Sequence, residues 1–390
     1  MEFAGSLGDL GTLLPLAIGM ILVNGMSVTG ILFSIGLFYI LAGLYFKVPV
    51  PVQPMKAIGA YSIATGVSAV QITGSAGLVC IFLFLIGITG AIDLLGRLIP
   101  KPIVRGVQLS TGLLLMNQGL KMIIGTSPYQ LGSNTIEPYL IVQNIGPLPI
   151  SILFGAIGFA ITMLLLHSKK LPAAIAVMVF GLSAGVLLGT HEGFSTMTPG
   201  LHTPELLPFG LPASGDLAIA FFVLVLPQLP MTVGNAIIAN ADLSQEYFQE
   251  NAAKVTYKTT TLSMSLANFI SFLVGGIPLC HGAGGLAAHY HFGARTGGSN
   301  IIIGSIFLLL ALLLGPQALS VIHLLPFSIL GVLLIFAGGQ LCLTILDMFN
   351  RKHMFIILLM ASITLTTNLA WGFAAGLAVI HLFQSDKFTI

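Results

Sequence analysis

The chain has 390 residues, of which 56% are apolar and only 7% are charged, with 14 Lys and Arg against 12 Asp and Glu. A soluble protein carries roughly 25% charged residues, so the composition excludes an ordinary soluble domain. A formal net charge of +2 gives no reason to expect a nucleic-acid partner. The three cysteines, Cys80, Cys280 and Cys342, lie in apolar stretches without a pairing pattern and are expected to be packing residues.

Long apolar segments follow one another from the amino terminus, with no cleavable signal peptide expected before the first. No charged residue occurs in 10–46, 57–92 or 296–346. A membrane-spanning helix needs about 20 mostly apolar residues, so each of these runs holds one or two spans. Hydropathy with Gly, Pro and charge as boundaries predicts an all-α integral membrane protein of about 14 segments. In chain order they are 4–23, 28–46, 50–66, 74–95, 103–120, 149–167, 171–188, 217–239, 258–274, 278–292, 299–315, 325–346, 354–367 and 369–384.

The basic residues predict how these segments are oriented, because Lys and Arg mark cytoplasmic loops. With the amino terminus inside, only Lys121 falls outside and only Lys56 falls within the membrane. We therefore expect a multi-pass protein of the cell membrane with both termini cytoplasmic and with 121–148 and 189–216 outside. The basic residues placed inside are Lys47, Arg97, Lys101, Arg105, Lys169, Lys170, Lys254, Lys258, Arg295, Arg351, Lys352 and Lys387.

The two halves of the chain carry similar motifs in the same order. Asp9 in 8–15 corresponds to Gln228 in 227–234 at an offset of 219, and 50–54 corresponds to 277–281 at an offset of 227. These offsets predict one repeat in 1–190 and a second in 215–390. Each repeat would hold about seven spans, an odd number, so the two would be inverted, a common plan of secondary transporters. Core and gate bundles would then draw helices from both repeats, with no soluble regulatory domain.

Two of the predicted segments are broken by Pro and Gly. Alternating prolines prevent a helix in 48–54, although one can begin at Pro54. Residues 275–281 are equally poor in helix formers, and 282–288 can open a second helix. Two half-helices that meet in mid-membrane would direct their amino ends at one point and favour an anion there. The glycines in 282–285 would let an oxyanion approach the main chain closely.

Lys56 is expected in the first turn of the first half-helix, where a charge inside the membrane is costly and usually functional. It can assist an anion, or pair with Asp9 of the first span, and the two interpretations are compatible. Gln53, Gln228 and Thr232 offer neutral hydrogen bonds to a substrate.

Four motifs resemble the plant-type molybdate transporter family, which is related to the sulfate permease (SulP) superfamily. They are SLGDLGTLLP at 6–15, PVQPMKA at 51–57, PQLPMTVGN at 227–235, and PLCHGAGGLAA at 278–288 followed by FGAR at 292–295. The resemblance implies the inverted seven-plus-seven architecture of uracil and sulfate permeases, in which homodimers are common. It also implies uptake of molybdate, with tungstate or sulfate as further cargo. The substrate-binding residues that it implies are Asp9, Thr12, Gln53, Met55, Lys56, Ala57, Gln228, Thr232, His281, Gly282, Ala283, Gly284 and Gly285.

The mechanism expected from this resemblance is secondary active transport by alternating access. A co-transported proton is expected as the coupling ion, with Asp9 and His281 as the titratable groups near the site.

Three other interpretations stay open at this point. A sulfate or other anion permease would share the same chemistry. A nucleobase–proton symporter of the same fold would carry glutamates where this chain has Gln228. A membrane enzyme with His281, His289 and His291 as ligands is disfavoured, because no nucleophile element or closed metal-ligand set accompanies them. We expect no cofactor and no metal, and an interfacial position for His289 and His291.

Overall fold

The computed structural model describes residues 1–92, 100–166, 168, 171–198 and 200–383. Four predicted cytoplasmic basic residues and the ends of the predicted spans 74–95, 149–167 and 369–384 lie outside the described residues. The four basic residues are Arg97, Lys169, Lys170 and Lys387.

The first half of the chain contains helices and three short strands. They are α1 (Glu2–Ser6), α2 (Leu10–Asn24), α3 (Val28–Phe46), β1 (Gln53–Pro54), α4 (Lys56–Thr65), α5 (Ala69–Thr89), α7 (Lys101–Ile124), α8 (Pro128–Ser133), β2 (Asn144–Ile145), β3 (Leu148–Pro149), α9 (Ile150–Leu165), α10 (Ala173–Leu188) and the 3₁₀ turn η1 (Phe194–Thr196).

The second half is again helical, with one short strand. Its elements are α11 (Ser214–Ile219), η2 (Ala220–Val225), α12 (Leu226–Met231), η3 (Thr232–Ala239), α13 (Asn240–Phe248), η4 (Gln249–Ala252), α14 (Tyr257–Val274), β4 (Leu279–Cys280), α15 (Ala283–His291), α16 (Gly298–Leu314), η5 (Gly315–Gln317), α17 (Ala318–His323), α18 (Phe327–Leu343), η6 (Thr344–Asp347), α19 (Arg351–Thr366) and α20 (Leu369–Phe383). Of these, η2 and η3 are π-helices.

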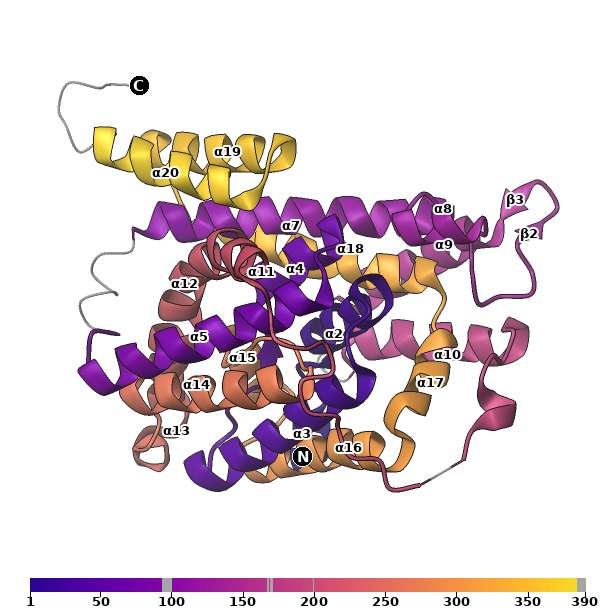
Figure 1. Cartoon of the computed structure of the whole chain (residues 1–390), viewed down its shortest axis with the longest axis horizontal. Helices are drawn as coiled ribbons and strands as arrows, with labels where there is room; N and C mark the ends of the chain where they lie inside the picture. Colours follow the sequence, from indigo (N-terminus) through magenta and orange to yellow (C-terminus); the bar gives the residue numbers. More distant parts are fainter. Residues whose placement is uncertain (93–99, 167, 169–170, 199, 384–390) are drawn as a thin grey trace.

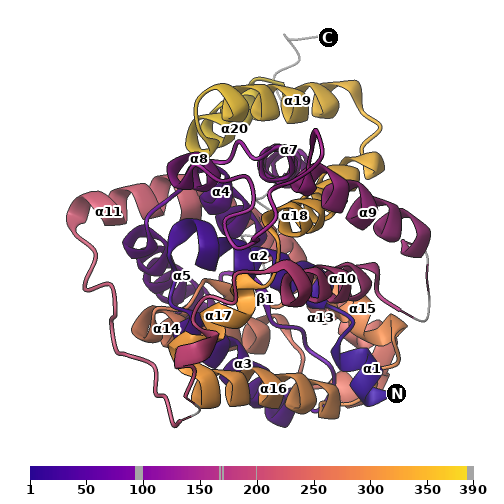
Figure 2. The ribbon, with the colours of Figure 1, turned by 90° about the vertical axis from the view of Figure 1, so that its right-hand side faces the viewer.

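Helices distant in the sequence pack side by side. The long helix α7 lies along α18, and α19 and α20 cover it from the edge of the molecule (Figures 1 and 2). On the other side α3 packs along α16 and α5 along α14. Each half of the chain therefore contributes one helix to each of these pairs.

Every predicted membrane segment overlaps a helix, and the fold is that of an apolar, membrane-type helical protein. Within the described residues, 5 helical stretches are long and apolar enough to cross a membrane, and four shorter apolar helices accompany them. The count of about 14 spans thus stays a prediction. The five stretches are Val28–Phe46, Ala69–Thr89, Ser214–Ala252, Gly298–His323 and Phe327–Asp347.

The first predicted span differs from the structure, because it is interrupted between α1 and α2. A Cβ on Gly5 would overlap the backbone of Ala294, and one on Gly8 would lie 2.7 Å from the carbonyl oxygen of Ala288. This close approach to α15 and the loop after it turns the chain, and α2 then begins with Asp9 as its N-cap residue.

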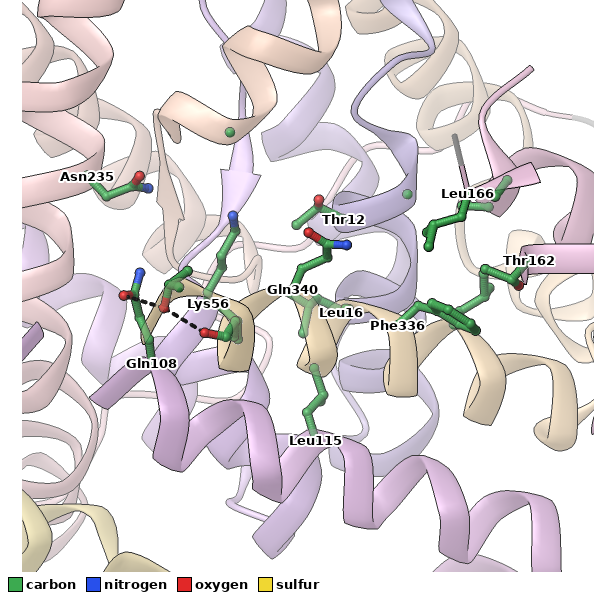
Figure 3. A pocket seen from close by; sticks show the side chains of 18 residues that line it. Thr12, Leu16, Lys56, Gln108, Leu115, Thr162, Leu166, Asn235, Phe336 and Gln340 are labelled. Carbon is green, nitrogen blue, oxygen red and sulfur yellow. Dashed lines mark hydrogen bonds between the residues drawn. The ribbon is translucent and has the colours of Figure 1, made fainter. Parts of the chain in front are cut away.

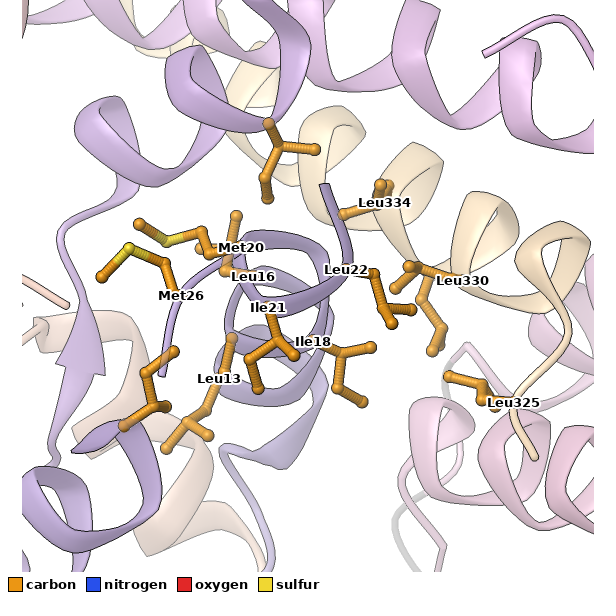
Figure 4. Close-up of a cluster of buried hydrophobic side chains, with 14 of the residues drawn as sticks. Leu13, Leu16, Ile18, Met20, Ile21, Leu22, Met26, Leu325, Leu330 and Leu334 are labelled. Atoms are coloured by element: carbon orange, nitrogen blue, oxygen red, sulfur yellow. The ribbon is translucent and has the colours of Figure 1, made fainter. Parts of the chain in front are cut away.

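Helix α2 lies at the centre of the largest hydrophobic cluster. Leu13, Leu16 and Met20 are all but fully buried, and on another side of the helix Leu330 and Leu334 of α18 lie beside Leu22 (Figure 4). The burial of most of its residues fixes the position of α2, and with it the position of Asp9 and Thr12 at its amino end.

The two Pro- and Gly-broken segments meet as a short antiparallel ladder. Gln53 of β1 pairs with Cys280 of β4, and the N–H of Met55 donates to the carbonyl oxygen of Pro278 at 2.8 Å. Helix α4 begins at Lys56 and α15 at Ala283, within two residues of the predicted starts. The ladder therefore holds two helix amino ends side by side.

Candidate functional site

A cavity of about 420 Å³ lies between the two half-helices, α2 and the pair α7–α18. Lys56 lines it from the first turn of α4, Thr12 from α2 and Gly284 from α15 (Figure 3). Three predicted site residues from separate segments are thus brought to one space.

The lysine faces the amino end of the second half-helix. A Cβ on Gly284 would lie 3.8 Å from the Nζ atom of Lys56 and would meet nothing else within contact distance. Ala283 and Gly284 are the first two residues of α15, and the first N–H groups of a helix have no partner within it. A cationic side chain and a helix amino end therefore border the same part of the cavity, which favours negative charge.

Asp9 and Gln53 form a buried pair behind this surface. The amide nitrogen of Gln53 donates to Oδ1 of Asp9 at 2.5 Å, and both side chains are buried. A Cβ on Gly285 would lie 2.5 Å from Oδ2 of Asp9, and one on Gly282 would overlap Oε1 of Gln53. These two glycines therefore make room for the pair rather than for a ligand.

Lys56 forms no ion pair with Asp9. Within the described ranges, the ion pairs join Asp347 to Lys101 and to Arg105. The amino group of Lys56 is thus left for the cavity.

Gln228 caps the amino end of the first half-helix, α4. Its Oε1 atom accepts the N–H of Ala57 at 2.9 Å, and its Nε2 atom donates to the hydroxyl of Thr232 at 3.1 Å. Pro227 and Pro230 lack N–H donors, and the helix around them widens into π-turns on both sides. Such π-turns are frequent at functional sites. Asn235, one turn beyond Thr232, lines the cavity.

His281 does not line the cavity. Its Nδ1 atom lies 2.8 Å from the carbonyl oxygen of Pro51, its Nε2 atom lies 3.1 Å from the hydroxyl of Ser263, and its ring stacks on Phe38. The remaining predicted residues lie at the starts of the two helices: Met55 is the N-cap residue of α4, and Ala57 and Ala283 lie in the first turns of α4 and α15. Of these, Met55 extends the ladder through its N–H, which donates to the carbonyl oxygen of Pro278.

The interfacial position predicted for His289 is wrong. Its side chain is fully buried, and its Nδ1 atom lies 2.8 Å from the carbonyl oxygen of Gly5. The close packing of α1 on α15 covers it, whereas His291 is exposed and its interfacial position stays a prediction. In the part of the chain that the structure describes, no three His, Cys, Asp or Glu side chains gather as a metal site would require.

The sequence did not indicate the part of the cavity wall that α7 and α18 supply. It carries Gln340 and Thr344 from the α18 end and Gln108 from α7 (Figure 3). The Oε1 atom of Gln108 accepts the hydroxyl of Thr344 at 2.9 Å. The sequence did offer one signal, because Gln108 and Gln340 each carry a carboxamide within an apolar helix. Burying such a group costs free energy unless it has hydrogen-bond partners.

The chain matches one protein-family model and several curated proteins. Residues 1–115 and 220–341 match the family model described as "Molybdate transporter of MFS superfamily". Molybdate transporter 2 of Arabidopsis thaliana is 31% identical over 98% of this chain and 87% of its own length. Molybdate transporter 1 of Chlamydomonas reinhardtii is 29% identical over 96% of this chain and 90% of its own length.

Two solved structures of transport proteins resemble the whole chain. The transmembrane domain of the cyanobacterium bicarbonate transporter BicA aligns with a TM-score of 0.68 over 96% of both chains, at 16% identity. SLC26A9 aligns with a TM-score of 0.67 over 99% of this chain and 66% of its own, at 15% identity. At these identities the likeness shows the fold alone, which the chain shares with SLC26A9 and with the transmembrane domain of BicA. The matched family model and the curated relatives show that this chain is a membrane transporter, not an enzyme, and that it belongs to the molybdate transporter family.

Proposed function

We propose that this chain is a secondary active transporter of molybdate, or of a related tetrahedral oxyanion such as tungstate or sulfate. The observation that carries the proposal is the amino group of Lys56, which borders a cavity opposite the first turn of α15 and has no carboxylate partner among the described residues. The names of the curated relatives give molybdate as the cargo.

In the proposed complex each residue has a distinct role. Lys56 supplies the charge, and the first N–H groups of α15 donate hydrogen bonds that strengthen when the acceptor is ionised. Thr12 and Gln340 offer neutral polar groups from α2 and α18. Gly284 keeps the main chain accessible, because a side chain there would project toward Lys56. The cavity of about 420 Å³ has room for the anion with some of its water.

The position of the cavity supports an inward-facing state. Its walls include the amino end of α7, the carboxyl ends of α9 and α18, and the start of α10. These ends adjoin the basic stretches predicted to be cytoplasmic. We therefore propose a cell-membrane protein with cytoplasmic termini. In the alternating-access cycle, its core would move relative to a gate formed by α7, α9, α10 and α18–α20. The two repeats, 1–190 and 215–390, would supply helices to both parts.

Uptake of a dianion into a negative-inside cell costs about 2.3 kcal/mol per charge per 100 mV, so concentrative uptake needs a coupled cation. We propose a proton carried by Asp9, whose Oδ2 atom is buried without a hydrogen-bond partner among the described residues. His281 is less suited, because both ring nitrogens have partners. Uptake into proteoliposomes at two imposed pH gradients tests this, and equal rates would contradict proton coupling.

The substrate itself is tested by calorimetric titration of the purified protein with molybdate, sulfate and uracil at fixed salt and pH. We expect molybdate to bind at least about tenfold more tightly than sulfate, which corresponds to about 1.4 kcal/mol, and uracil not to bind. Equal or tighter sulfate binding would make the chain a broader anion permease, and a uracil signal would favour a nucleobase symporter. Light scattering on the same sample tests the predicted homodimer.

A further inference from the structure

A second cavity of about 260 Å³ adjoins the basic end of α7. Lys101 and Arg105 line it from the first two turns of α7, and η3 forms the facing wall. Asn235 of η3 lines both this cavity and the one that contains Lys56. The two spaces therefore share a side chain, and the second lies at the end of α7 that is predicted to be cytoplasmic.

Arg105 connects the two cavities by its hydrogen bonds. Its Nε and Nη2 atoms hold the two carboxylate oxygens of Asp347 at 3.0 and 2.5 Å, and its Nη1 atom donates to Oε1 of Gln108 at 2.8 Å. Gln108 lines the first cavity. One guanidinium thus binds a carboxylate in a bidentate manner and, with its third nitrogen, positions a side chain of the first cavity.

Asp347 is shared by two cations. Lys101 also approaches it, with Nζ at 2.8 Å from Oδ2. The cluster of one carboxylate, one ammonium and one guanidinium carries an excess positive charge. The carboxylate is partly exposed, at 39%, and Lys101 is exposed at 57%. Because the carboxylate is partly exposed to solvent, a dissolved anion can reach the two cations and compete with it for them.

We propose that Lys101 and Arg105 form a second oxyanion site, a station on the route between the first cavity and the cytoplasm, which Asp347 occupies as an internal counter-ion. The inference rests on the proposed function, because it concerns the route of the same anion. A tetrahedral oxyanion presents two oxygens to the guanidinium in the same bidentate manner as a carboxylate. An arriving ion therefore replaces Asp347, and the return of Asp347 releases it.

The site is tested by counting bound ions with radiolabelled molybdate in equilibrium dialysis at low salt. In the Asp347→Asn variant the internal competitor is removed, and we expect two molybdate ions per chain, where the unaltered protein binds one tightly. Adding Arg105→Gln to Asp347→Asn removes the weaker ion. A single ion in Asp347→Asn, bound with the unaltered affinity, would overturn the proposal.

Adding Lys56→Ala to Asp347→Asn separates this proposal from the proposed function. We expect the ion at Lys56 to be lost and the ion at Arg105 to remain. If the unaltered protein binds no ion but Asp347→Asn binds one that Arg105→Gln abolishes, the second site stands and the site at Lys56 fails. If no variant binds an ion, both fail.

Transport gives an independent readout that does not require Asp347→Asn to fold. In Arg105→Gln we expect the rate of molybdate counterflow in proteoliposomes to fall about fivefold, while the equilibrium affinity at Lys56 changes less than about twofold, a difference under 0.5 kcal/mol. Lys121→Gln, at the other end of α7, is the matched control and keeps the rate. Equal rates in the two variants would overturn the proposal.

Discussion

Two helix amino ends in this protein meet negative or polar atoms in different ways. At α18 the carboxylate of Glu137 accepts the N–H groups of Phe327 and Ser328 at 2.7 and 2.9 Å. At α4 the neutral carboxamide of Gln228 accepts the N–H of Ala57, and Lys56 next to it borders a cavity. The first helix end is already capped by an acidic side chain of the protein itself, whereas the second keeps a positive charge and space beside it.

The difference separates a structural cap from a binding site. Anions are favoured at any helix amino end, so the helix end alone does not identify a site. What distinguishes α4 is a neutral cap, a lysine without a carboxylate partner among the described residues, and a second amino end, that of α15, across the cavity. Variants that change one of these features at a time should therefore differ in how much anion affinity they lose.

The largest effect is expected from removing the charge. In Lys56→Ala the anion loses a charge-assisted hydrogen bond, worth about 1.5–3 kcal/mol, so its affinity should fall about tenfold to hundredfold. Molybdate titration measures this. Lys121→Ala removes a lysine from the carboxyl end of α7 and is the control that should leave the affinity unchanged. Similar losses in both variants would mean that Lys56 acts only through the overall charge of the protein.

The next effect comes from giving α4 the kind of cap found at α18. Gln228→Glu places a carboxylate on the N–H of Ala57, close to Lys56, where it competes with the substrate. Repulsion between charges a few ångströms apart amounts to several kcal/mol at most in a partly polar interior, and we expect affinity to fall about tenfold at pH 8. Gln228→Met, of similar size and uncharged, should lose much less. An equal loss in both would refute the competition.

Neighbouring glycines of α15 should respond differently to alanine. In Gly284→Ala the new methyl group projects toward Lys56 without a clash, so affinity should fall by about tenfold at most. Its thermal stability should not fall, because Ala is the better helix former. In Gly285→Ala the methyl group meets Asp9 and Gln53, and overpacking should cost about 1–3 kcal/mol of stability. Melting curves beside titrations separate the two, and a reversed pattern would contradict the assigned roles.

The smallest effect on anion affinity is expected from changing Glu137, the cap of α18. Its effect should appear instead in how the stability of the protein depends on pH. Burial raises the pKa of Glu137 from 4.5 to about 7, although the hydrogen bonds from Ser328 and Phe327 lower it. Because the folded pKa lies above the unfolded one, this group's contribution to stability is complete below about pH 4.5 and is lost as pH rises to about 7, by up to about 1.4 kcal/mol per pH unit.

The variant Glu137→Gln should therefore show a flatter dependence of melting temperature on pH between about 4.5 and 7, with molybdate affinity unchanged. A pH profile identical to that of the unaltered protein would show that Glu137 does not titrate in this range.

The sequence predicted the helical segments and the two broken ones well, because Pro and Gly act locally on the backbone. It also predicted that Thr12, Lys56 and Gly284 belong to one site. It did not assign Gln108, Gln340 and Thr344 to the cavity, since their position depends on how α7 packs against α18. The direction in which these side chains point depends on how distant helices pack together, and local sequence patterns do not specify that packing.

The histidines illustrate the same limit. His281 lies in the predicted motif but binds Pro51 and Ser263 rather than lining the cavity, and His289 is buried by α1. Residue spacing placed both on the correct segment. The partner of each nitrogen comes from residues far away in the chain, so spacing alone does not predict it.

The most direct test is to locate the metal atom of bound molybdate by anomalous scattering from crystals of the protein. We expect a molybdenum position in the cavity between the amino group of Lys56, the hydroxyl of Thr12 and the main chain at Gly284. A position elsewhere, with this cavity empty of anomalous signal, would contradict the assignment of the site.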